Sequence, residues 1–264
     1  MSIFLRKGAC QMGKIIAVAN QKGGVGKTTT AVNLSACVAA RGKKVLLCDF
    51  DPQGNASSGV GFREEEGCIT IYEVMLGESP VQQARRRGRY CDLLPGSIQL
   101  AAAELQLAAH PRKERRLKEA LDAIRDEYDF IFIDCPPSLG LLTVNALVAS
   151  DTVLVPMQCE YYSLEGLSQL MTSVRAVKRS MNPGLDIEGI LLTMYDGRTN
   201  LTIQVAEEVK KYFGKKVYKT VIPRNVRLSE APSHGLPVLA YDRTSRGALA
   251  YGAVADEFLS KNRR

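Results

Sequence analysis

Short apolar runs alternate along the chain with longer stretches in which apolar residues recur every three or four positions. The runs predict buried strands at residues 15–19, 45–48, 129–134, 152–155, 187–193 and 217–222. The longer stretches predict amphipathic helices, among them residues 27–41, which Gly42 ends, and about 246–259. Strands that alternate with helices indicate an α/β fold: a doubly wound, mostly parallel sheet with helices on both faces.

Apolar side chains on one face of three predicted helices are expected in the core. They are Leu117, Ala120, Leu121 and Ile124, then Val205, Val209 and Phe213, and finally Tyr251, Val254, Ala255 and Phe258. No repeat, low-complexity segment or long linker interrupts the pattern, so residues 13–264 are expected to form one domain. Residues 1–12 are interpreted as a flexible N-terminal arm, because Met12-Gly-Lys leads directly into the first strand.

The composition agrees with one well-packed domain. The chain has 264 residues, of which 45% are hydrophobic and 24% charged, which argues against disorder. No apolar run approaches the length of about 18 residues that a membrane span needs, and the apolar start is too short for a secretory signal. Seven cysteines lie at least 11 residues apart, without a Cys-x-x-Cys pair, so reduced thiols and a cytoplasmic location are expected.

The net charge of +7 is unevenly distributed. Residues 1–174 hold 19 Lys+Arg and 19 Asp+Glu, whereas residues 175–264 hold 16 against 9. This asymmetry indicates a polyanionic partner for the last third of the chain, with a solvated basic face as the simpler alternative.

The segment Gln21-Lys-Gly-Gly-Val-Gly-Lys-Thr28 lies between the first strand and the first helix. It departs from the ordinary phosphate-loop pattern, which has Gly where this chain has Gln21. The three glycines still allow successive N–H groups to point at phosphate oxygens, and the helix adds the positive end of its dipole. The alternative is a tight glycine-rich turn without a ligand.

Two side chains of this segment are suited to binding a nucleotide and its metal ion. Lys27 can reach the β- and γ-phosphates of a nucleotide, and the Thr28 hydroxyl can ligate Mg²⁺. The nucleotide-binding residues expected here are Lys22, Gly23, Gly24, Val25, Gly26, Lys27, Thr28 and Thr29. Lys22 is a second lysine that one phosphate pocket does not need, so we expect it to serve a nucleotide held across a dimer interface.

The loop resembles the deviant phosphate loop of the ParA/MinD class of ATPases, K-G-G-x-G-K-T. Four further segments extend the resemblance. They are Asp49-Phe-Asp-Pro-Gln-Gly-Asn55, Ile133-Asp-Cys-Pro-Pro-Ser138, Glu160-Tyr-Tyr-Ser-Leu-Glu165 and Ile222-Pro-Arg-Asn-Val-Arg-Leu-Ser-Glu-Ala-Pro-Ser-His234. Together they resemble the Soj-type chromosomal ParA family from about residue 13 to the C-terminus.

The resemblance implies an ATP-dependent sandwich dimer that requires Mg²⁺ and hydrolyses ATP slowly until a partner stimulates it. It implies that Lys22 contacts the nucleotide of the opposite subunit and that Lys22, Lys27 and Asp51 are catalytic. It further implies a ParB-type centromere-binding protein as the partner, non-specific double-stranded DNA as a ligand, and a role in chromosome or plasmid partitioning on the nucleoid.

Carboxylates follow two of the predicted strands. Asp49 and Asp51 come after one strand and Asp134 ends another, and strand ends converge on the phosphate loop in doubly wound folds. The resemblance assigns the Mg²⁺ side to Asp134, directly or through water, and the orientation of the attacking water to Asp51. Asp49 lies in the same segment. The alternative is that each Asp caps the next turn or helix.

The basic C-terminal third contains the remaining candidate residues. The resemblance places Pro223, Arg224 and Asn225 beside the nucleotide base, and Arg198 and Arg227 among the DNA contacts. Exposed arginines bind phosphates by displacing counterions and need not read bases. Surface ion pairing of Arg198 and Arg227 is the alternative.

Three other classes of protein stay open. A MinD-type ATPase acting on membranes would need a basic amphipathic C-terminal helix, whereas residues 246–259 read as a helix packed in the core. An iron–sulfur carrier would need further cysteines besides Cys135 in a matching motif. A DNA-binding regulator that uses ATP only as a switch would share the loop, and Asp51 favours hydrolysis over it.

Overall fold

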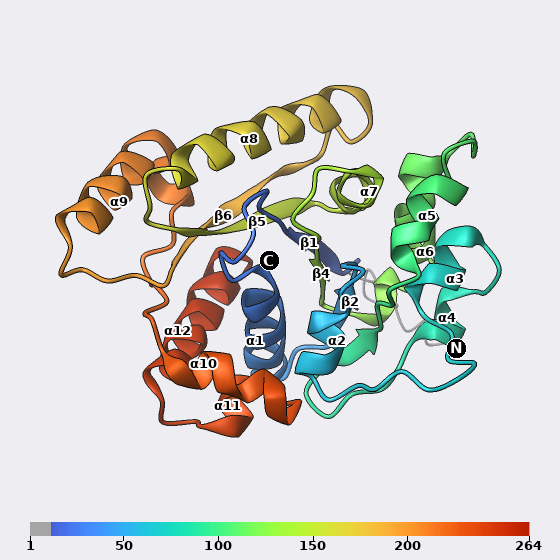
Figure 1. Cartoon of the computed structure of the whole chain (residues 1–264), viewed down its shortest axis with the longest axis horizontal. Helices are drawn as coiled ribbons and strands as arrows, with labels where there is room; N and C mark the ends of the chain where they lie inside the picture. Colours follow the sequence, from blue (N-terminus) through green and yellow to red (C-terminus); the bar gives the residue numbers. More distant parts are fainter. Residues whose placement is uncertain (1–11, 264) are drawn as a thin grey trace, which may run out of the picture.

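The computed structural model describes residues 12–263, so the predicted N-terminal arm lies outside the described residues except for Met12. Six strands form one parallel sheet in the order β3-β2-β4-β1-β5-β6 (Figure 1). The strands are β1 (Lys14–Val18), β2 (Val45–Asp49), β3 (Asp92–Leu94), β4 (Phe130–Asp134), β5 (Thr152–Gln158) and β6 (Asp186–Thr193).

Helices connect these strands. The α-helices are α1 (Lys27–Ala39), α2 (Asn55–Gly59), α3 (Ile71–Leu76), α4 (Val81–Ala84), α5 (Leu100–Gln106), α6 (Arg116–Asp122), α7 (Leu141–Ala149), α8 (Ser163–Ser180), α9 (Asn200–Phe213), α10 (Val226–Glu230), α11 (Val238–Tyr241) and α12 (Arg246–Lys261). The 3₁₀ helices are η1 (Lys113–Arg115), η2 (Arg125–Glu127), η3 (Gly214–Lys216) and η4 (Ala231–His234).

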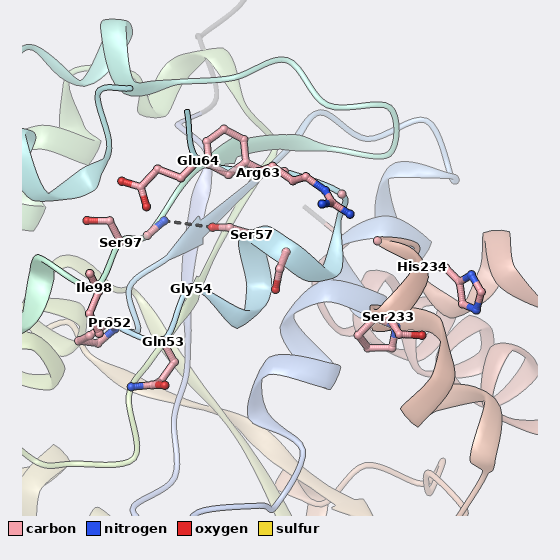
Figure 2. A pocket seen from close by; sticks show the side chains of 16 residues that line it. Pro52, Gln53, Gly54, Ser57, Arg63, Glu64, Ser97, Ile98, Ser233 and His234 are labelled. Carbon is pink, nitrogen blue, oxygen red and sulfur yellow. Dashed lines mark hydrogen bonds between the residues drawn. The ribbon is translucent and has the colours of Figure 1, made fainter. Parts of the chain in front are cut away.

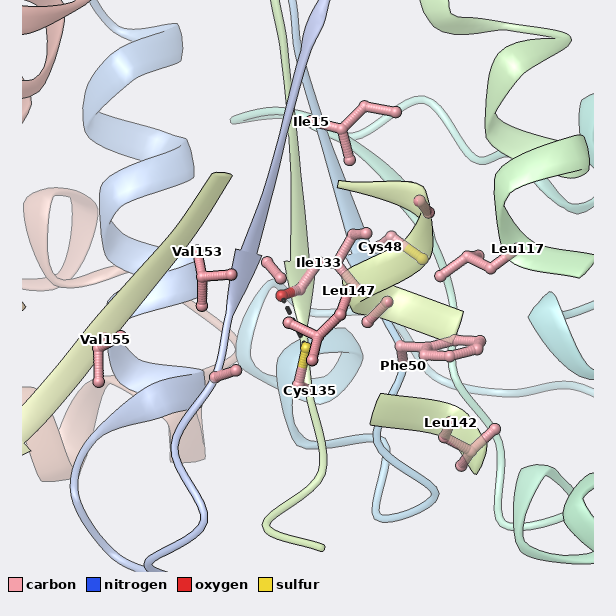
Figure 3. Close-up of a cluster of buried hydrophobic side chains, with 14 of the residues drawn as sticks. Ile15, Cys48, Phe50, Leu117, Ile133, Cys135, Leu142, Leu147, Val153 and Val155 are labelled. Carbon is pink, nitrogen blue, oxygen red and sulfur yellow. Dashed lines mark hydrogen bonds between the residues drawn. The ribbon is translucent and has the colours of Figure 1, made fainter. Parts of the chain in front are cut away.

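Both faces of the sheet are buried, as a parallel sheet between two helical layers requires. In β1, Ile15 and Ala17 point to one hydrophobic cluster, and Ile16 and Val18 point to the other. The first cluster lies under α6, α7 and α8, and Figure 3 shows strand residues such as Ile133 packed against α7. The second lies under α1 and α12, which pack against each other on the opposite side (Figure 1).

The aromatic contacts of α12 place its apolar face in the second cluster. The ring centroid of Phe258 lies 5.0 Å from that of Phe130 and 5.4 Å from that of Phe132. Tyr251, Val254 and Ala255 are buried on the same face. The predicted doubly wound α/β fold is confirmed, and α12 is the core-packing helix that the sequence predicts.

The strand predicted at residues 217–222 is wrong as a regular strand. This segment runs beside β6, with an isolated bridge between Val217 and Ile190. The N–H groups of Tyr218 and Ile222 donate to β6 carbonyls, each at 2.9 Å. Between them, the N–H groups of Lys219 and Thr220 donate to the carboxylate of Glu257 on α12, at 3.0–3.1 Å, and not to β6. The pairing with β6 is therefore interrupted in the middle of the segment, where a long-range side chain takes two N–H groups.

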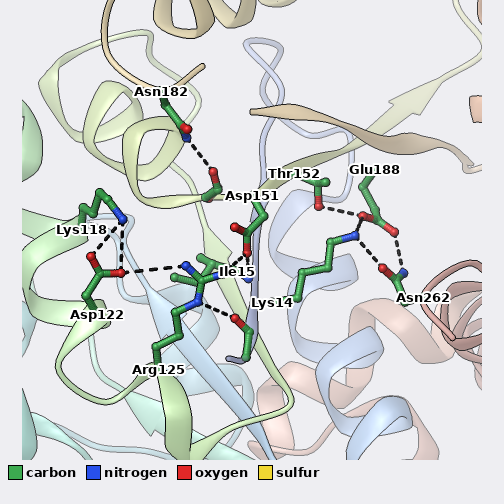
Figure 4. A network of polar contacts seen from close by, with 12 residues as sticks. Lys14, Ile15, Lys118, Asp122, Arg125, Asp151, Thr152, Asn182, Glu188 and Asn262 are labelled. Carbon is green, nitrogen blue, oxygen red and sulfur yellow. Dashed lines mark hydrogen bonds and ion pairs between the residues drawn. The ribbon is translucent and has the colours of Figure 1, made fainter. Parts of the chain in front are cut away.

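A buried ionic network fixes the amino end of the sheet (Figure 4). Glu188 of β6 is buried and pairs with Lys14 of β1. It also accepts hydrogen bonds from the Thr152 hydroxyl at 2.7 Å and the Asn262 amide at 2.7 Å. Burial alone would raise the pKa of Glu188, but the Lys14 charge and these hydrogen bonds hold the pKa below its usual value.

Replacing the buried carboxylate tests this network. We expect Glu188→Gln to lower the free energy of unfolding by about 3 kcal/mol at neutral pH, because Lys14 loses its charge partner. Since the folded pKa of Glu188 is depressed, its stabilisation is present above the unfolded pKa of about 4.3 and is lost as pH falls through the folded value. The difference between wild type and Glu188→Gln should therefore shrink below about pH 4 in urea unfolding curves.

Asp186→Asn is the matched control, because Asp186 lies on the same strand and makes an exposed pair with Lys216. It should change stability little. A difference between wild type and Glu188→Gln that grows on acidification would contradict this account.

Candidate nucleotide-binding and catalytic site

The phosphate loop joins β1 to α1 at the point where the sheet order reverses around β1. Gly24 and Gly26 adopt φ angles of 72° and 84°, in the left-handed region that glycine reaches without strain. Gly26 precedes the first residue of α1, so the free N–H groups of the first helical turn open toward the loop. The loop therefore has the backbone geometry of an anion site.

Two polar side chains at the strand ends hold the loop from behind. The Gln158 amide of β5 donates to the Gly24 carbonyl at 3.0 Å, and the Thr193 hydroxyl of β6 donates to the Val25 carbonyl at 2.8 Å. These carbonyls are thereby fixed on the side of β5 and β6. Neither residue was predicted from the sequence, although each is a polar residue at the carboxyl end of an apolar strand.

Lys27 is only 6% exposed, and its ammonium donates to the Lys22 carbonyl at 3.2 Å. Burial lowers the pKa of Lys27, against the opposing influence of Asp134, Cys135 and Asp51. The side chain is thus a desolvated cation held over the loop, which is the environment in which a phosphate charge is most favourable.

Asp134 ends β4 with its carboxylate fully buried. Within residues 12–263, neither carboxylate oxygen has a partner of good hydrogen-bond geometry. Burial and then the charge of Asp49 raise the pKa of Asp134 well above its usual range, and the nearby Thr28 hydroxyl and Lys27 offset only part of this. A buried carboxylate without partners, beside a hydroxyl, fits the oxygen ligands and the charge that Mg²⁺ needs.

Asp51 and Asp49 face different surroundings. The Asp51 carboxylate is nearly buried and accepts a hydrogen bond from the Gln53 N–H at 3.0 Å. The Asp49 carboxylate accepts hydrogen bonds from both the N–H and the hydroxyl of Ser57, each at 2.7 Å. The structure therefore separates two carboxylates that the sequence places in one segment.

Lys22 begins the loop close to the amino end of α8. Its N–H donates to the Asn20 side chain at 3.0 Å, and its ammonium pairs with Glu160 at 2.6 Å. In the single chain, the second lysine of the loop is therefore held by a carboxylate of its own subunit.

The predicted base-binding residues line a cavity of about 380 Å³ beside the end of the loop. Pro223, Arg224 and Asn225 share this cavity with Gly26 and Thr29. Met194 also lines it and has a φ of 49°, the one positive φ of a non-glycine residue in the described part of the chain. The structure thus brings together two predicted groups that are nearly 200 residues apart.

A larger cavity of about 840 Å³ is lined in part by residues of the Asp49–Asn55 segment (Figure 2). Gln53, Gly54 and Ser57 line it from this segment and α2, and Ser233 and His234 line it from η4. This cavity was not predicted from the sequence, because its walls come from three separate stretches of the chain, residues 52–64, 96–98 and 232–235.

The predicted DNA-contacting arginines lie on the surface. Arg198 is 88% exposed on its side chain and pairs with Asp196 at 2.7 Å. Arg227 pairs with Glu230 at 2.7 Å and with Asp242 at 3.3 Å. Both arginines are therefore ion-paired in the single chain. Such exposed pairs are weak enough for a phosphate to replace the carboxylate.

A parallel sheet with a Gly-Lys-Thr loop at its reversal point, facing buried carboxylates on neighbouring strands, defines the class of P-loop ATPases. The AAA domain family matches residues 13–187. The chain is 59% identical over 248 residues to the sporulation initiation inhibitor protein Soj of Bacillus subtilis (strain 168), covering 93% of this chain and 98% of that protein.

A second relative is the chromosome partitioning protein ParA of Myxococcus xanthus (strain DK1622), which is 50% identical over 258 residues, covering 97% of this chain and 91% of that protein. A crystal structure of cobyrinic acid a,c-diamide synthase from Mycobacterium smegmatis with a bound ATP analogue and magnesium has the same fold. It superposes with a TM-score of 0.82 at 37% identity and covers 94% of each chain.

The chain therefore belongs to the ParA/Soj family of chromosome-partitioning ATPases. The predicted family, fold and ATPase class are confirmed. The match to a structure that holds an ATP analogue and magnesium agrees with the predicted ATP and Mg²⁺.

Proposed function

We propose that this chain hydrolyses ATP as an ATP-dependent dimer, binds DNA non-specifically, and acts in chromosome or plasmid partitioning with a ParB-type centromere-binding partner. The observation that carries the proposal is the convergence of Lys27, Asp51 and Asp134 on the phosphate loop. Both close relatives named above carry sporulation or partitioning names.

The reaction proposed is in-line attack of water on the γ-phosphate. The N–H groups of residues 23–29 bind the phosphates, and Lys27 neutralises charge on the β- and γ-phosphates. Thr28 and Asp134 hold Mg²⁺, which when bound offsets phosphate charge. Asp51 orients the attacking water, so positioning and electrostatics supply most of the rate.

Lys22 links ATP to dimerisation in this proposal. Its pair with Glu160 is partly exposed, with side-chain exposures of 31% and 46%, so the ammonium can leave at little energetic penalty. In the sandwich dimer, Lys22 exchanges Glu160 for the phosphates bound to the other subunit. A dimer forms because each nucleotide then contacts both chains.

Nucleotide and DNA sites share two loops. Tyr195 pairs with Pro223 as an isolated bridge, so the loop that holds Arg198 lies against the loop that lines the base cavity and leads to Arg227. The basic excess of residues 175–264 supports a phosphate-binding surface in this part of the chain. A dimer presents that surface twice, which raises DNA affinity without base reading and places the protein on nucleoid DNA.

Three observations bear on the alternatives. The apolar face of α12 is used in the core, which disfavours a MinD-like membrane-surface role for it. No helix within residues 12–263 is long and apolar enough to cross a bilayer. Cys135 is fully buried in the first hydrophobic cluster (Figure 3), and burial raises the pKa of its thiol, which disfavours an exposed thiolate that ligates an iron–sulfur cluster.

ATP turnover tests the proposal directly and separates it from an ATP-switched regulator. We expect slow phosphate release by the protein alone and the largest release when double-stranded DNA and a ParB-type protein are both present. The four mixtures with neither, either or both are measured under the same salt conditions. A rate that is unaffected by the ParB-type protein with DNA present would contradict the partitioning role.

Substitution of the second loop lysine tests the dimer. We expect Lys22→Ala to bind ATP normally and to lose ATP-dependent dimerisation, because it lacks the contact to the partner's nucleotide. Sizing chromatography with a non-hydrolysable ATP analogue measures the dimer, and titration with a fluorescent analogue measures binding. Lys27→Ala is the contrasting variant and should lose ATP binding itself. A persistent Lys22→Ala dimer would sink the assignment.

A double substitution tests the DNA surface. We expect Arg198→Ala with Arg227→Ala to abolish DNA retardation in the presence of ATP while ATP binding stays unchanged. For any residual binding, the slope of log K against log salt concentration should become shallower by about 0.9 for each lost phosphate contact. The charge-matched control is Arg87→Ala with Arg89→Ala, two exposed arginines near β3 at the opposite edge of the sheet. Equal losses in both double variants would refute the placement.

A further inference from the structure

Asp49 is the last residue of β2 and is 0% exposed. One carboxylate oxygen accepts both the N–H and the hydroxyl of Ser57, at 2.7 Å each, and the other faces the Asp51 N–H at 3.4 Å. Ser57 lies in α2, six residues beyond Asp51. The Asp49 carboxylate therefore ties the end of the strand to the helix that follows and closes the loop that carries Asp51.

Ser57 extends this connection to a third element. Its hydroxyl oxygen accepts the Gly96 N–H at 3.1 Å, just beyond the end of β3, as the dashed line in Figure 2 shows. A Cβ at Gly96 would lie 2.9 Å from the Asp49 carbonyl oxygen and 3.1 Å from that of Asp51. The ends of β2 and β3 and the helix α2 thus meet at one buried point with no room for a side chain.

The Asp51 carboxylate depends on this support. The hydrogen bond described for its side chain comes from Gln53, two residues away in the same loop, and the Asp51 carbonyl accepts the Gly54 N–H at 3.0 Å. Such local bonds shape the turn without fixing it to the rest of the fold. Its position over the site is set by the two ends of the loop, which Asp49 and Ser57 join.

Asp49 cannot take the place of Asp51 toward water. Both of its oxygens face groups of its own chain, and the side chain has no exposed surface. Burial raises the pKa of Asp49 to about 6, although the hydrogen bonds from Ser57 oppose this. Burying a carboxylate is unfavourable, and a hydrogen-bonded one retained beneath the catalytic loop indicates a specific geometric role.

We propose that Asp49, Ser57 and the Gly96 N–H form a clamp that positions Asp51 to orient the attacking water. Asp49 and Ser57 are positioning residues, which act through Asp51 and contact neither ATP nor the attacking water. The inference rests on the proposed function, because it requires Asp51 to act in hydrolysis.

The test compares Asp49→Asn and Ser57→Ala with Asp51→Ala in the full chain. Each clamp variant should lower the kcat of ATP hydrolysis at least tenfold, keep the affinity for a fluorescent ATP analogue within twofold, and retain the ATP-dependent dimer. Ser58→Ala is the matched control in the same helix, because the exposed Ser58 hydroxyl donates only to the Asn55 carbonyl at 3.2 Å. It should keep the wild-type kcat.

A double-mutant cycle separates positioning from general damage. If the clamp acts through Asp51, Asp49→Asn adds no further loss of kcat in the Asp51→Ala background. Losses that multiply in the double variant, or a changed ATP affinity, would overturn the clamp. If Asp49→Asn does not fold, the same double-mutant cycle is measured with Ser57→Ala and Asp51→Ala, because Ser57→Ala removes only one oxygen atom.

The outcomes distinguish the two levels of the proposal. Wild-type kcat in both clamp variants, beside a strong loss in Asp51→Ala, overturns the clamp and leaves the proposed function standing. Undiminished phosphate release by Asp51→Ala contradicts the catalytic assignment of the proposed function itself.

Discussion

Buried charge at the carboxyl ends of the central strands is the constraint around which this molecule is arranged. Asp49 and Asp134 stand directly opposite each other in the β2–β4 register, and Asp134 also pairs with Val18, just before the phosphate loop. Burial raises the pKa values of both carboxyl groups and lowers that of Lys27, so the surrounding protein disfavours every one of these charges. A polyphosphate with Mg²⁺ supplies the countercharges that the protein lacks. The fold thus maintains an electrostatic imbalance that its ligand relieves.

The same strand ends connect the nucleotide to the surface. Thr193 holds the Val25 carbonyl of the loop, Met194 follows in a left-handed conformation, and Tyr195 bridges to Pro223. Arg198 comes three residues later. Because a left-handed methionine is strained, the surrounding contacts must hold it in place. The short segment of residues 193–198 therefore holds the phosphate loop, lines the base cavity and carries a candidate DNA contact. Within the proposed function, this gives nucleotide-dependent DNA binding a physical basis.

The sequence predicts those parts of the fold and site that depend on residues close together in the chain. The first strand, the glycines and the carboxylates after β2 and β4 are all visible as an apolar run followed by particular residues. Residues 217–222 were misassigned, since Glu257 on a distant helix captures two of their N–H groups. β3 was missed because three residues at a sheet edge carry almost no periodicity. The contacts of Ser57 with Asp49 and Gly96 could not be predicted from the sequence either, because they join three elements that only the tertiary fold brings together.

The ion pairs divide the described basic residues of the C-terminal third into two groups, those that pair with a carboxylate and those that do not. Arg198 and Arg227 each pair with carboxylates of their own chain, so on the proposed function a DNA phosphate has to displace an acid to reach them. Lys210, Lys211 and Lys215, which belong to α9 and η3, are exposed and have no salt bridge within residues 12–263. On the proposed function, these lysines attract DNA without any exchange, whereas the arginines engage only when phosphates outcompete Asp196 or Glu230. Ion pairing leaves the net charge of +7 unchanged, but it determines which cations are unpaired in one chain. On the proposed function, pairing two chains doubles this net positive charge on the DNA-binding dimer.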